Sequence, residues 1–202
     1  MGKFEQMKQI KYEVLHLKAS PLYEYRTSHG YFPVIGEGSH DSKVMFIGEA
    51  PGRNEAKTGR PFCGAAGKIL DELLLHIKLP RDEVYITNIV KDRPPENRDP
   101  LPDEIKIYGP FLDQQINIIQ PKIIGTLGRY SMQYIMEQFG LHDVLLPISK
   151  MHGKFFMAKA AYGDIVIVPL YHPAVAIYNA STKDTLKEDF KMIRKMYDEH
   201  VV

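Results

Sequence analysis

Three chemically versatile side chains follow short apolar stretches of the sequence, each at the point where the stretch ends. Glu49 comes after VMFIG, Asn88 after VYIT and His172 after IVIVPLY. A carboxylate and an imidazole can move protons or stabilise charge, and an amide offers a hydrogen-bond donor beside an acceptor. The segment from Glu49 to Gly64 is also rich in glycine and proline, which lets a ligand come close to the backbone. These residue types indicate a ligand site.

The hydrophobic pattern predicts the elements that position these residues. Strands are expected where short apolar runs lack a helical period, at 43–48, 83–90, 122–127 and 164–170. Amphipathic helices are expected where apolar residues recur with helical spacing, at 3–17, 64–77, 103–119, 129–139 and 182–196. The prolines of Lys91–Leu101 predict an irregular loop, and 154–159 is expected to be a hairpin element.

The alternation of strands and helices predicts the fold class. It indicates a three-layer α/β/α sandwich around a central four-stranded, mainly parallel sheet. Such sheets bind ligands beyond the carboxyl ends of their strands, so Glu49, Asn88 and His172 are expected to meet at one end of the sheet. The 202 residues are expected to form one domain, with a helix and loop in 1–40 and the catalytic core in 41–202.

Several common kinds of site do not match the sequence. The phosphate-binding pattern GxxxxGK[ST] is absent because Gly64 and Gly67 are too close and Ile69 follows Lys68, and GxGxxG is absent too. The eight histidines show neither HxH nor HxxxH spacing, so no metal site is expected. No serine has a GxSxG context. Cys63 is interpreted as a packing residue, with a nucleophile as the alternative.

The composition sets wider limits on function. The 26 lysines and arginines balance 25 aspartates and glutamates, for a net charge of +1. Binding to nucleic acid would therefore depend on a local basic cluster. A single cysteine excludes an intramolecular disulfide framework. No apolar run is long enough to cross a bilayer, and the N-terminal residues lack a signal-peptide pattern. We expect a soluble, cytoplasmic monomer with no membrane partner.

Four sequence blocks, taken together, resemble the uracil-DNA glycosylase superfamily, most closely its family 4. The blocks are GEAPGRNEAKTGRPFCGAAGKILD, VYITNIVKDRPPENRDP, QPKIIGTLGRYS and YHPA, and they follow the order and spacing of the family. Each block is weakly diagnostic by itself, but the four together are specific. Enzymes of this family flip uracil out of DNA and cut its N-glycosidic bond. The resemblance implies a glycosylase of base excision repair that acts on DNA containing uracil and releases free uracil.

The resemblance also implies roles for three residues in binding uracil. Phe62 resembles the aromatic side chain that stacks on the base. Asn88 resembles the amide that reads the pyrimidine edge through O4 and N3–H. His172, in the HP motif, resembles the donor that stabilises charge on O2 as uracil leaves. By local sequence alone, a core phenylalanine, a turn asparagine and a surface histidine are the alternatives.

The acidic residues of the first block resemble catalytic groups of family 4. Glu49 resembles the acid that orients or activates water and favours a cationic sugar. In the best-known branch the base is an aspartate one residue later, where this chain has Ala50, so that assignment does not transfer. Glu55 resembles a second acid near the pocket floor that excludes the thymine methyl, and Asn97 an amide that holds Glu55 or the water. Gly48 is expected at the uracil pocket beside them. We predict that Glu49 carries the chemistry, with Glu55 as the alternative.

The DNA-binding residues are expected around the same loops. The segment after His172 resembles the wedge that fills the space left by the flipped base, with Ile177 or Tyr178 as the wedge. Backbone amides at the start of the helix near Gly64 are candidates for binding a DNA phosphate. Further candidates for phosphate contact are the basic side chains that flank the loops, namely Arg60, Lys68, Arg93, Arg98 and Arg129.

The sequence departs from family 4 at the residues that bind its [4Fe–4S] cluster. Family members usually carry four cysteine ligands, whereas the matching positions here are Leu17, Ser20, Asp92 and Tyr108. A cluster needs thiolate ligands, so no cofactor is expected. Ordinary packing is expected in its place, with Leu17 and Tyr108 supplying apolar bulk and Asp92 a polar contact.

Two other functions remain open at this point. The departure from family 4 leaves room for a glycosylase that acts on another deaminated base, hypoxanthine or xanthine. It also leaves room for a damage sensor that holds uracil in DNA without cleaving it. A sensor would need Phe62 and Asn88 but has little use for Glu49, which favours the enzyme.

Overall fold

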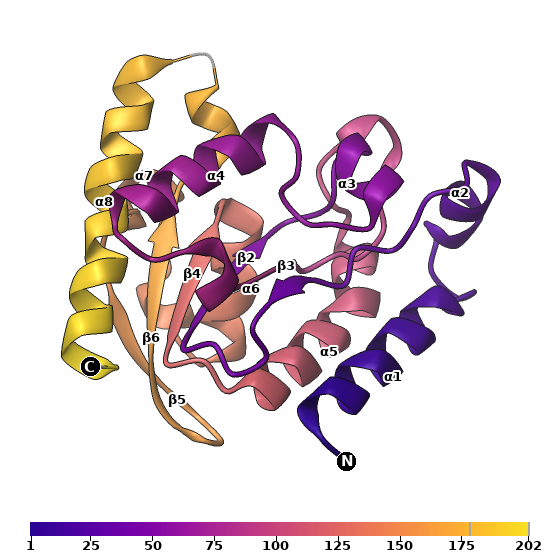
Figure 1. Ribbon diagram of the computed structural model, residues 1–202, viewed down its shortest axis with the longest axis horizontal. Coiled ribbons are helices and arrows are strands. Elements are labelled where there is room, and N and C mark those ends of the chain that lie inside the picture. The colour runs from indigo at the N-terminus through magenta and orange to yellow at the C-terminus, as the bar shows by residue number, and fades with distance from the viewer. Residues whose placement is uncertain (178, 202) are drawn as a thin grey trace.

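A six-stranded sheet lies at the centre of the protein (Figure 1). The computed structural model describes residues 1–177 and 179–201. The strands lie in the order β1-β3-β2-β4-β6-β5. Their bounds are β1 Glu37–Gly38, β2 Val44–Gly48, β3 Tyr85–Asn88, β4 Ile123–Leu127, β5 Phe156–Ala160 and β6 Gly163–Leu170. Because β2 stands between β3 and β4, the glycine-rich segment that follows it has a strand end on either side.

The four inner strands are parallel, as the sequence predicts. β2 pairs with β3 and with β4, and β4 pairs with β6, so the residues that follow these strands lie along one edge of the sheet. Two antiparallel strands extend the sheet beyond the expected four: β1 pairs with β3, and β5 pairs with β6. β5 is the expected hairpin element. β1 escapes prediction because a strand of two residues is too short to show a period.

Alternate residues of the inner strands enter two hydrophobic cores, one on each face of the sheet. Met45 and Ile47 of β2 pack with the helices of one layer, and Val44 and Phe46 pack with the other. The first layer consists of α1 (Lys3–Leu15), α5 (Pro102–Ile119) and α6 (Arg129–Gln138). The second consists of α4 (Ala65–His76) and α8 (Ala180–His200), which lie together in Figure 1. The α/β/α sandwich is therefore confirmed.

Short helices occupy segments where the sequence pattern predicts only loop. α3 (Arg53–Thr58) lies inside the glycine-rich segment, and α2 (Tyr23–Ser28) lies in the long N-terminal loop. Each has six residues, fewer than two turns, so its apolar positions do not repeat often enough to reveal a helix. The remaining short elements are η1 Arg81–Glu83, η2 Pro95–Asn97, η3 His142–Val144, α7 Ile148–Met151 and η4 Pro173–Ala176.

The five longer helices lie where the hydrophobic period predicts them, although α8 is longer at both ends than expected. Its outer turns carry few apolar residues, so the period does not extend to them. No helix among the described residues combines the length and apolar character that crossing a bilayer requires.

Candidate active site

A cavity of about 370 Å³ opens at the carboxyl end of the parallel strands. Glu49 after β2, Asn88 at the end of β3 and His172 after β6 all line it. The expectation that these side chains meet at one end of the sheet is therefore confirmed. The other lining residues are Ala50, Pro51, Gly52, Glu55, Phe62, Ala66, Pro94, Asn97, Arg98, Asp99 and Ala174.

Asn88 and Phe62 approach each other across Gly48, the last residue of β2. A Cβ atom on Gly48 would lie 2.3 Å from Asn88 Oδ1 and 2.7 Å from Phe62 Cζ, so only glycine leaves room for both side chains. Asn88 is 2% exposed, and its Oδ1 has no hydrogen-bond partner among the described residues. Leaving a buried acceptor unpaired is costly. In the wall of a cavity, such an oxygen marks a place for a ligand that donates a hydrogen bond.

Phe62 sits in a strained turn just before α4. Its φ angle is 47°, in the left-handed region that non-glycine residues seldom adopt. Gly67 in the first turns of α4 touches this backbone, since a Cβ there would lie 1.8 Å from the Phe62 carbonyl oxygen. The Phe62 ring stacks on that of His172, with centroids 5.6 Å apart and an interplanar angle of 30°. The turn therefore presents an aromatic face beside an imidazole.

His172 is held in a neutral form with a defined N–H donor. Its Nδ1 accepts a hydrogen bond from the amide of Ala174 at 3.2 Å, which places the proton of the neutral ring on Nε2. Desolvation lowers the pKa of His172 to about 4, although the nearby Glu55 carboxylate acts in the opposite direction. At neutral pH the cavity wall therefore carries an uncharged imidazole that donates from Nε2.

Glu49 lies against the N-terminal end of α6. Its Oε1 accepts a hydrogen bond from the amide of Tyr130 at 3.0 Å. Gly128 precedes the helix with a φ of 106°, and a Cβ there would lie 2.3 Å from Oε1. Burial raises the pKa of Glu49 above its usual value; the Tyr130 amide opposes this rise, and the Asp99 carboxylate adds to it. A carboxylate with a raised pKa is a stronger proton acceptor.

Glu55 connects α3 to the turn that carries Phe62. Its Oε1 accepts hydrogen bonds from the amides of Cys63 at 3.0 Å and Gly64 at 2.9 Å. These amides belong to the start of α4, where unpaired N–H groups attract a carboxylate. The Gly64 amide is therefore engaged within the protein and is not the free donor that the sequence suggests, whereas its binding of a DNA phosphate stays a prediction. The reason is α3, which the sequence pattern does not reveal and which turns Glu55 toward α4.

Asn97 lies at the rim of the cavity, and the buried Arg93 holds its side chain. Glu96 and Asn97 both have positive φ angles, 55° and 56°. Asn97 Oδ1 accepts a hydrogen bond from Arg93 Nε at 2.7 Å, and Arg93 also donates to the hydroxyls of Tyr25 and Tyr31. Arg93 is only 9% exposed. It therefore holds the rim in place and does not lie open to a phosphate, which corrects the expectation for this residue.

The basic side chains near the cavity differ in how they are engaged. Lys68 is exposed on α4 and has no ion pair among the described residues. Arg98 binds both oxygens of the buried Glu104, at 2.6 and 2.9 Å. Arg129 is exposed and pairs with Asp99 at 2.5 Å. Both arginines are thus engaged in ion pairs within the protein.

The other DNA-binding candidates with a described structure, Arg60 and Ile177, do not line the cavity. Arg60 makes a two-pronged ion pair with Glu37, with both hydrogen bonds at 2.9 Å. Ile177 is half-buried directly after η4. The alternative wedge residue, Tyr178, lies outside the described residues.

Some lining residues are missing from the set that the sequence predicts. Asp99 lies two residues after Asn97 in ENRDP, and its place in that block was the available signal. Ala66 and Ala174 gave no signal, because a small apolar side chain becomes part of a cavity wall only through the fold.

A family model described as the uracil DNA glycosylase superfamily matches residues 35–198. This range contains every residue that lines the cavity. The chain belongs to the uracil DNA glycosylase superfamily. The match confirms the resemblance that the four sequence blocks indicate.

Curated relatives within the superfamily include proteins of two types. The chain is 48% identical to the type-4 uracil-DNA glycosylase of Sulfurisphaera tokodaii, over 95% of this chain and 85% of the relative. It is 37% identical to the type-4 uracil-DNA glycosylase of Archaeoglobus fulgidus, over 95% and 94%. It is 28% identical to the type-5 uracil-DNA glycosylase of Pyrobaculum aerophilum, over 83% and 78%. Of these three, the two type-4 proteins are the more similar.

Three of the four positions that the resemblance matches to cluster cysteines are joined by hydrogen bonds. The hydroxyl of Tyr108 donates to Asp92 Oδ2 at 2.6 Å and lies 2.7 Å from Ser20 Oγ. Arg26 lies 3.4 Å from Asp92 Oδ1. All four side chains are at most 5% exposed. Tyr108 is therefore more than the apolar bulk that was expected, because its hydroxyl is the centre of a buried polar network.

This network does not fit an iron–sulfur cluster. Leu17, at the remaining position, packs against the core and has no metal-binding atom. The single cysteine of the chain, Cys63, lies near Thr58, with Sγ 3.3 Å from its hydroxyl oxygen. Among the described residues, no three His, Cys, Asp or Glu side chains gather as a metal site would need.

Proposed function

We propose that the protein is a uracil-DNA glycosylase, which hydrolyses the N-glycosidic bond between uracil and the deoxyribose of DNA. The observation that carries the proposal is the buried Oδ1 of Asn88, which has no hydrogen-bond partner in the described part of the chain and lies in a cavity with Phe62, His172 and Glu49. Membership of the superfamily and the relatives named type-4 uracil-DNA glycosylases support the same reaction. The products are free uracil and an abasic site.

Recognition of uracil rests on Phe62 and Asn88. The Phe62 ring stacks on the flat face of the flipped base. Asn88 Oδ1 accepts a hydrogen bond from uracil N3–H, and the amide NH₂ donates to O4. Cytosine has a lone pair at N3 and an amino group at C4, so it would lose both hydrogen bonds. Its N3 would face Asn88 Oδ1, which is also an acceptor, and its amino group would face the amide NH₂, which is also a donor. A site built to bond a substrate N–H rejects an analogue without it.

Bond cleavage rests on His172 and Glu49. As the bond from N1 to C1′ breaks, negative charge develops on uracil and positive charge on the sugar. His172 donates from Nε2 to O2 and stabilises the anion without giving up a proton. Glu49 stabilises the cationic sugar and accepts a proton from the water whose oxygen bonds to C1′. That proton passes to solvent, and the uracil anion takes one from solvent after it leaves.

Other residues shape the pocket and hold the DNA. Glu55 fixes the turn of Phe62 and, at the cavity wall, keeps out the methyl group of thymine. Asn97 holds the rim, and Gly48 and Ala50 leave space for the base. The DNA backbone is bound by the basic side chains of Lys68, Arg98 and Arg129. The wedge that fills the space of the flipped base is either Ile177 or Tyr178.

The protein acts as a monomer without a [4Fe–4S] cluster. The buried hydrogen bonds among Ser20, Arg26, Asp92 and Tyr108 support this part of the proposal, because they occupy the side chains at the positions of the missing ligands. Purified protein is expected to contain no stoichiometric iron and to lack the broad visible absorption of a cluster. A brown, iron-containing protein would refute the cluster-free assignment.

The reaction is tested with end-labelled oligonucleotides that carry one uracil, hypoxanthine, xanthine or cytosine, followed by alkali to cut abasic sites. We expect scission at uracil alone. Asn88→Ala and Glu49→Gln are expected to slow it by about 10²- to 10⁴-fold. Asp143→Asn removes an exposed carboxylate outside the cavity and serves as the control that stays active.

Two outcomes would contradict the proposal. Scission at hypoxanthine or xanthine in place of uracil would keep the reaction and change the substrate. Tight retention of the uracil strand without scission would make the protein a damage sensor.

A further inference from the structure

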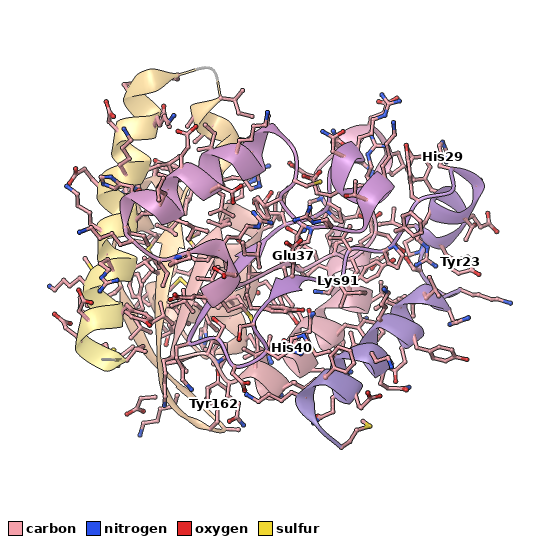
Figure 2. The ribbon with its side chains drawn as sticks, viewed as in Figure 1. Tyr23, His29, Glu37, His40, Lys91 and Tyr162 are labelled. Atoms are coloured by element: carbon pink, nitrogen blue, oxygen red, sulfur yellow. The ribbon has the colours of Figure 1, made fainter. Side chains whose placement is uncertain are left out.

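Lys91 is fully buried three residues after Asn88. Its side chain is 0% exposed, and Figure 2 places it in the interior near the end of β3. Lysine is almost never fully buried unless it has a partner. Among the described residues, its Nζ contacts only uncharged oxygens. A buried ammonium of this kind costs free energy and calls for an explanation beyond packing.

The ammonium of Lys91 bonds directly to the main chain of Asn88. Nζ donates to the Asn88 carbonyl oxygen at 2.6 Å and to the hydroxyl of Thr87 at 2.9 Å. Its third donor bonds to Oε1 of Gln115 on α5. All three N–H groups are therefore satisfied. They fasten the last two residues of β3 to the helix layer below the sheet.

The network continues away from the cavity. Gln115 Nε2 donates to the Ile35 carbonyl at 2.9 Å and to the Tyr85 hydroxyl at 3.0 Å. Thr87 also donates to the Ile35 carbonyl, at 2.7 Å. The Thr87 hydroxyl also lies 3.4 Å from the Asn88 carbonyl oxygen and 3.3 Å from Gln115 Oε1, but the hydrogen bonds of Lys91 to these two oxygens are shorter.

We propose that Lys91 is a positioning residue for base recognition, which holds the Asn88 main chain so that its side-chain amide meets the edge of uracil. The proposal rests on the proposed function. Lys91 binds the carbonyl oxygen of Asn88. The side-chain Oδ1 of this same residue has no partner among the described residues and faces the cavity. Two hydrogen bonds to a base edge require placement to within about 0.5 Å. In the described sheet Asn88 pairs with Gly48 of β2, and the Lys91 bond holds the same residue from the side of the helix layer.

The protonation state of Lys91 does not alter this role. Burial lowers the pKa of Lys91 to about 7, against the opposing effect of Asp113 on α5. The neutral amine keeps two N–H donors, enough to bond the Asn88 carbonyl and one further acceptor.

The test compares Lys91→Met with Tyr85→Phe. Lys91→Met keeps the length of the side chain and removes the donors to Asn88. Tyr85→Phe removes a hydroxyl from the outer end of the same buried network and leaves Asn88 untouched. The measurements are the affinity for free uracil, by calorimetry, and the affinity for DNA that carries a tetrahydrofuran abasic-site analogue, which has no base for Asn88 to read.

For Lys91→Met we expect uracil affinity and kcat/KM on uracil DNA to fall by about 10- to 100-fold. Its affinity for the abasic analogue should stay within about twofold of the unmodified protein. Tyr85→Phe should lower thermal stability and change neither affinity. If Lys91→Met fails to fold, Lys91→Gln is measured in the same way, and it should lose uracil affinity selectively because its shorter side chain does not reach the carbonyl.

Three results would overturn the proposal. The first is that the Lys91 variant binds uracil as tightly as Tyr85→Phe does. If the unmodified protein still cleaves uracil DNA, this result leaves the glycosylase assignment intact. The second is an equal loss for uracil and for the abasic analogue, which indicates a merely structural lysine. The third is an unmodified protein that neither cleaves uracil DNA nor binds uracil, which removes the proposed function as well.

Discussion

The cavity depends on Gly48 because glycine has no Cβ atom. Gly48 ends the central strand β2, and the Asn88 amide and the Phe62 ring both reach into the space that a Cβ atom would take. Phe62 in turn adopts a left-handed backbone that places its ring beside His172. At the scale of single residues, close approach and tolerated strain shape the pocket as much as polar groups do.

Substitution of Gly48 by alanine is expected to block the pocket. The new methyl group would overlap Asn88 Oδ1 and the Phe62 ring, so one of them must move. We expect uracil excision to fall by about 100-fold or more, measured as kcat/KM on uracil DNA. Circular dichroism and thermal unfolding serve to show that the fold persists. Normal kcat/KM in a folded Gly48→Ala protein would contradict the proposed placement of uracil.

The pH dependence of cleavage is expected to report on Glu49. In the proposed reaction its ionised form is the active one, and burial raises the pKa of Glu49 above the usual 4.5. Acidification should therefore remove activity at a pH above 4.5. His172, with a pKa of about 4, stays neutral in that range and does not cause the loss. The profile of kcat/KM against pH tests this, and the acid limb should disappear from the residual activity of Glu49→Gln. An unchanged limb in that variant would reassign it to another group.

At the scale of elements, short and irregular segments hold the side chains that line the cavity. The N-terminal end of α6 fixes Glu49 through the Tyr130 amide, and α3 supplies Glu55 to the start of α4. η2 sets the rim through the Arg93–Asn97 hydrogen bond. The regular sheet decides where the site lies, and these connections decide how its side chains are oriented.

Two variants of Glu55 separate its hydrogen bonds from its charge. Glu55→Gln keeps an oxygen that can accept from the Cys63 and Gly64 amides, whereas Glu55→Ala leaves both amides unpaired. We expect the alanine variant to lose about 10- to 100-fold in kcat/KM because the turn of Phe62 is released. The glutamine variant should keep most of the activity. Equal losses in both would show that the charge of Glu55 is what matters, and would favour Glu55 as a second acid of the reaction.

At the scale of the whole molecule, a buried polar network joins the N-terminal segment to the catalytic core. Arg26 on α2 donates to the carbonyls of Val14 and Leu15 at the end of α1 and contacts Asp92, which follows β3. Tyr108 on α5 completes the connection. The network ties α1, α2 and α5 to the loop that leads from Asn88 to the cavity rim.

Asp92 is expected to make stability depend on pH in a recognisable direction. Desolvation raises the pKa of Asp92 to about 6, above its usual 3.8. Between pH 3.8 and about 6, Asp92 is therefore protonated in the folded protein and ionised in the unfolded chain. Its contribution to the free energy of unfolding is full below pH 3.8 and is lost as pH rises through about 6. The shift corresponds to about 3 kcal/mol at most.

Denaturant unfolding between pH 4 and 7 (about the range of this titration) tests the prediction on the unmodified protein and Asp92→Asn. Other carboxylates titrate in both proteins, so the difference between them isolates Asp92. The stability of the unmodified protein relative to Asp92→Asn should fall as pH rises. A difference that does not change with pH would show that Asp92 keeps its ordinary pKa in the folded state.

The hydrophobic pattern predicts much of the fold and part of the site. Glu49, Asn88 and His172 were accessible to prediction because each follows a buried parallel strand, and the ends of such strands share one edge of a sheet. α3 and β1 were not, because elements of six and two residues are shorter than the repeats that reveal them. The bond from the Gly64 amide to Glu55 was not foreseen because the sequence pattern does not reveal α3.

The amino-acid sequence is enough to predict the layers of the fold, the edge of the sheet where the site lies, and the family. These properties follow from the periodicity of apolar residues and from residue types at fixed spacing, both of which are local along the chain. Three further features emerge from the folded chain: Glu55 binds the start of α4, Arg93 is buried, and Lys91 bonds to the Asn88 carbonyl. The physical reason is that burial and hydrogen bonding depend on neighbours in space. Lys91 and Gln115 lie 24 residues apart in sequence, and nothing in the sequence near either one indicates that they meet.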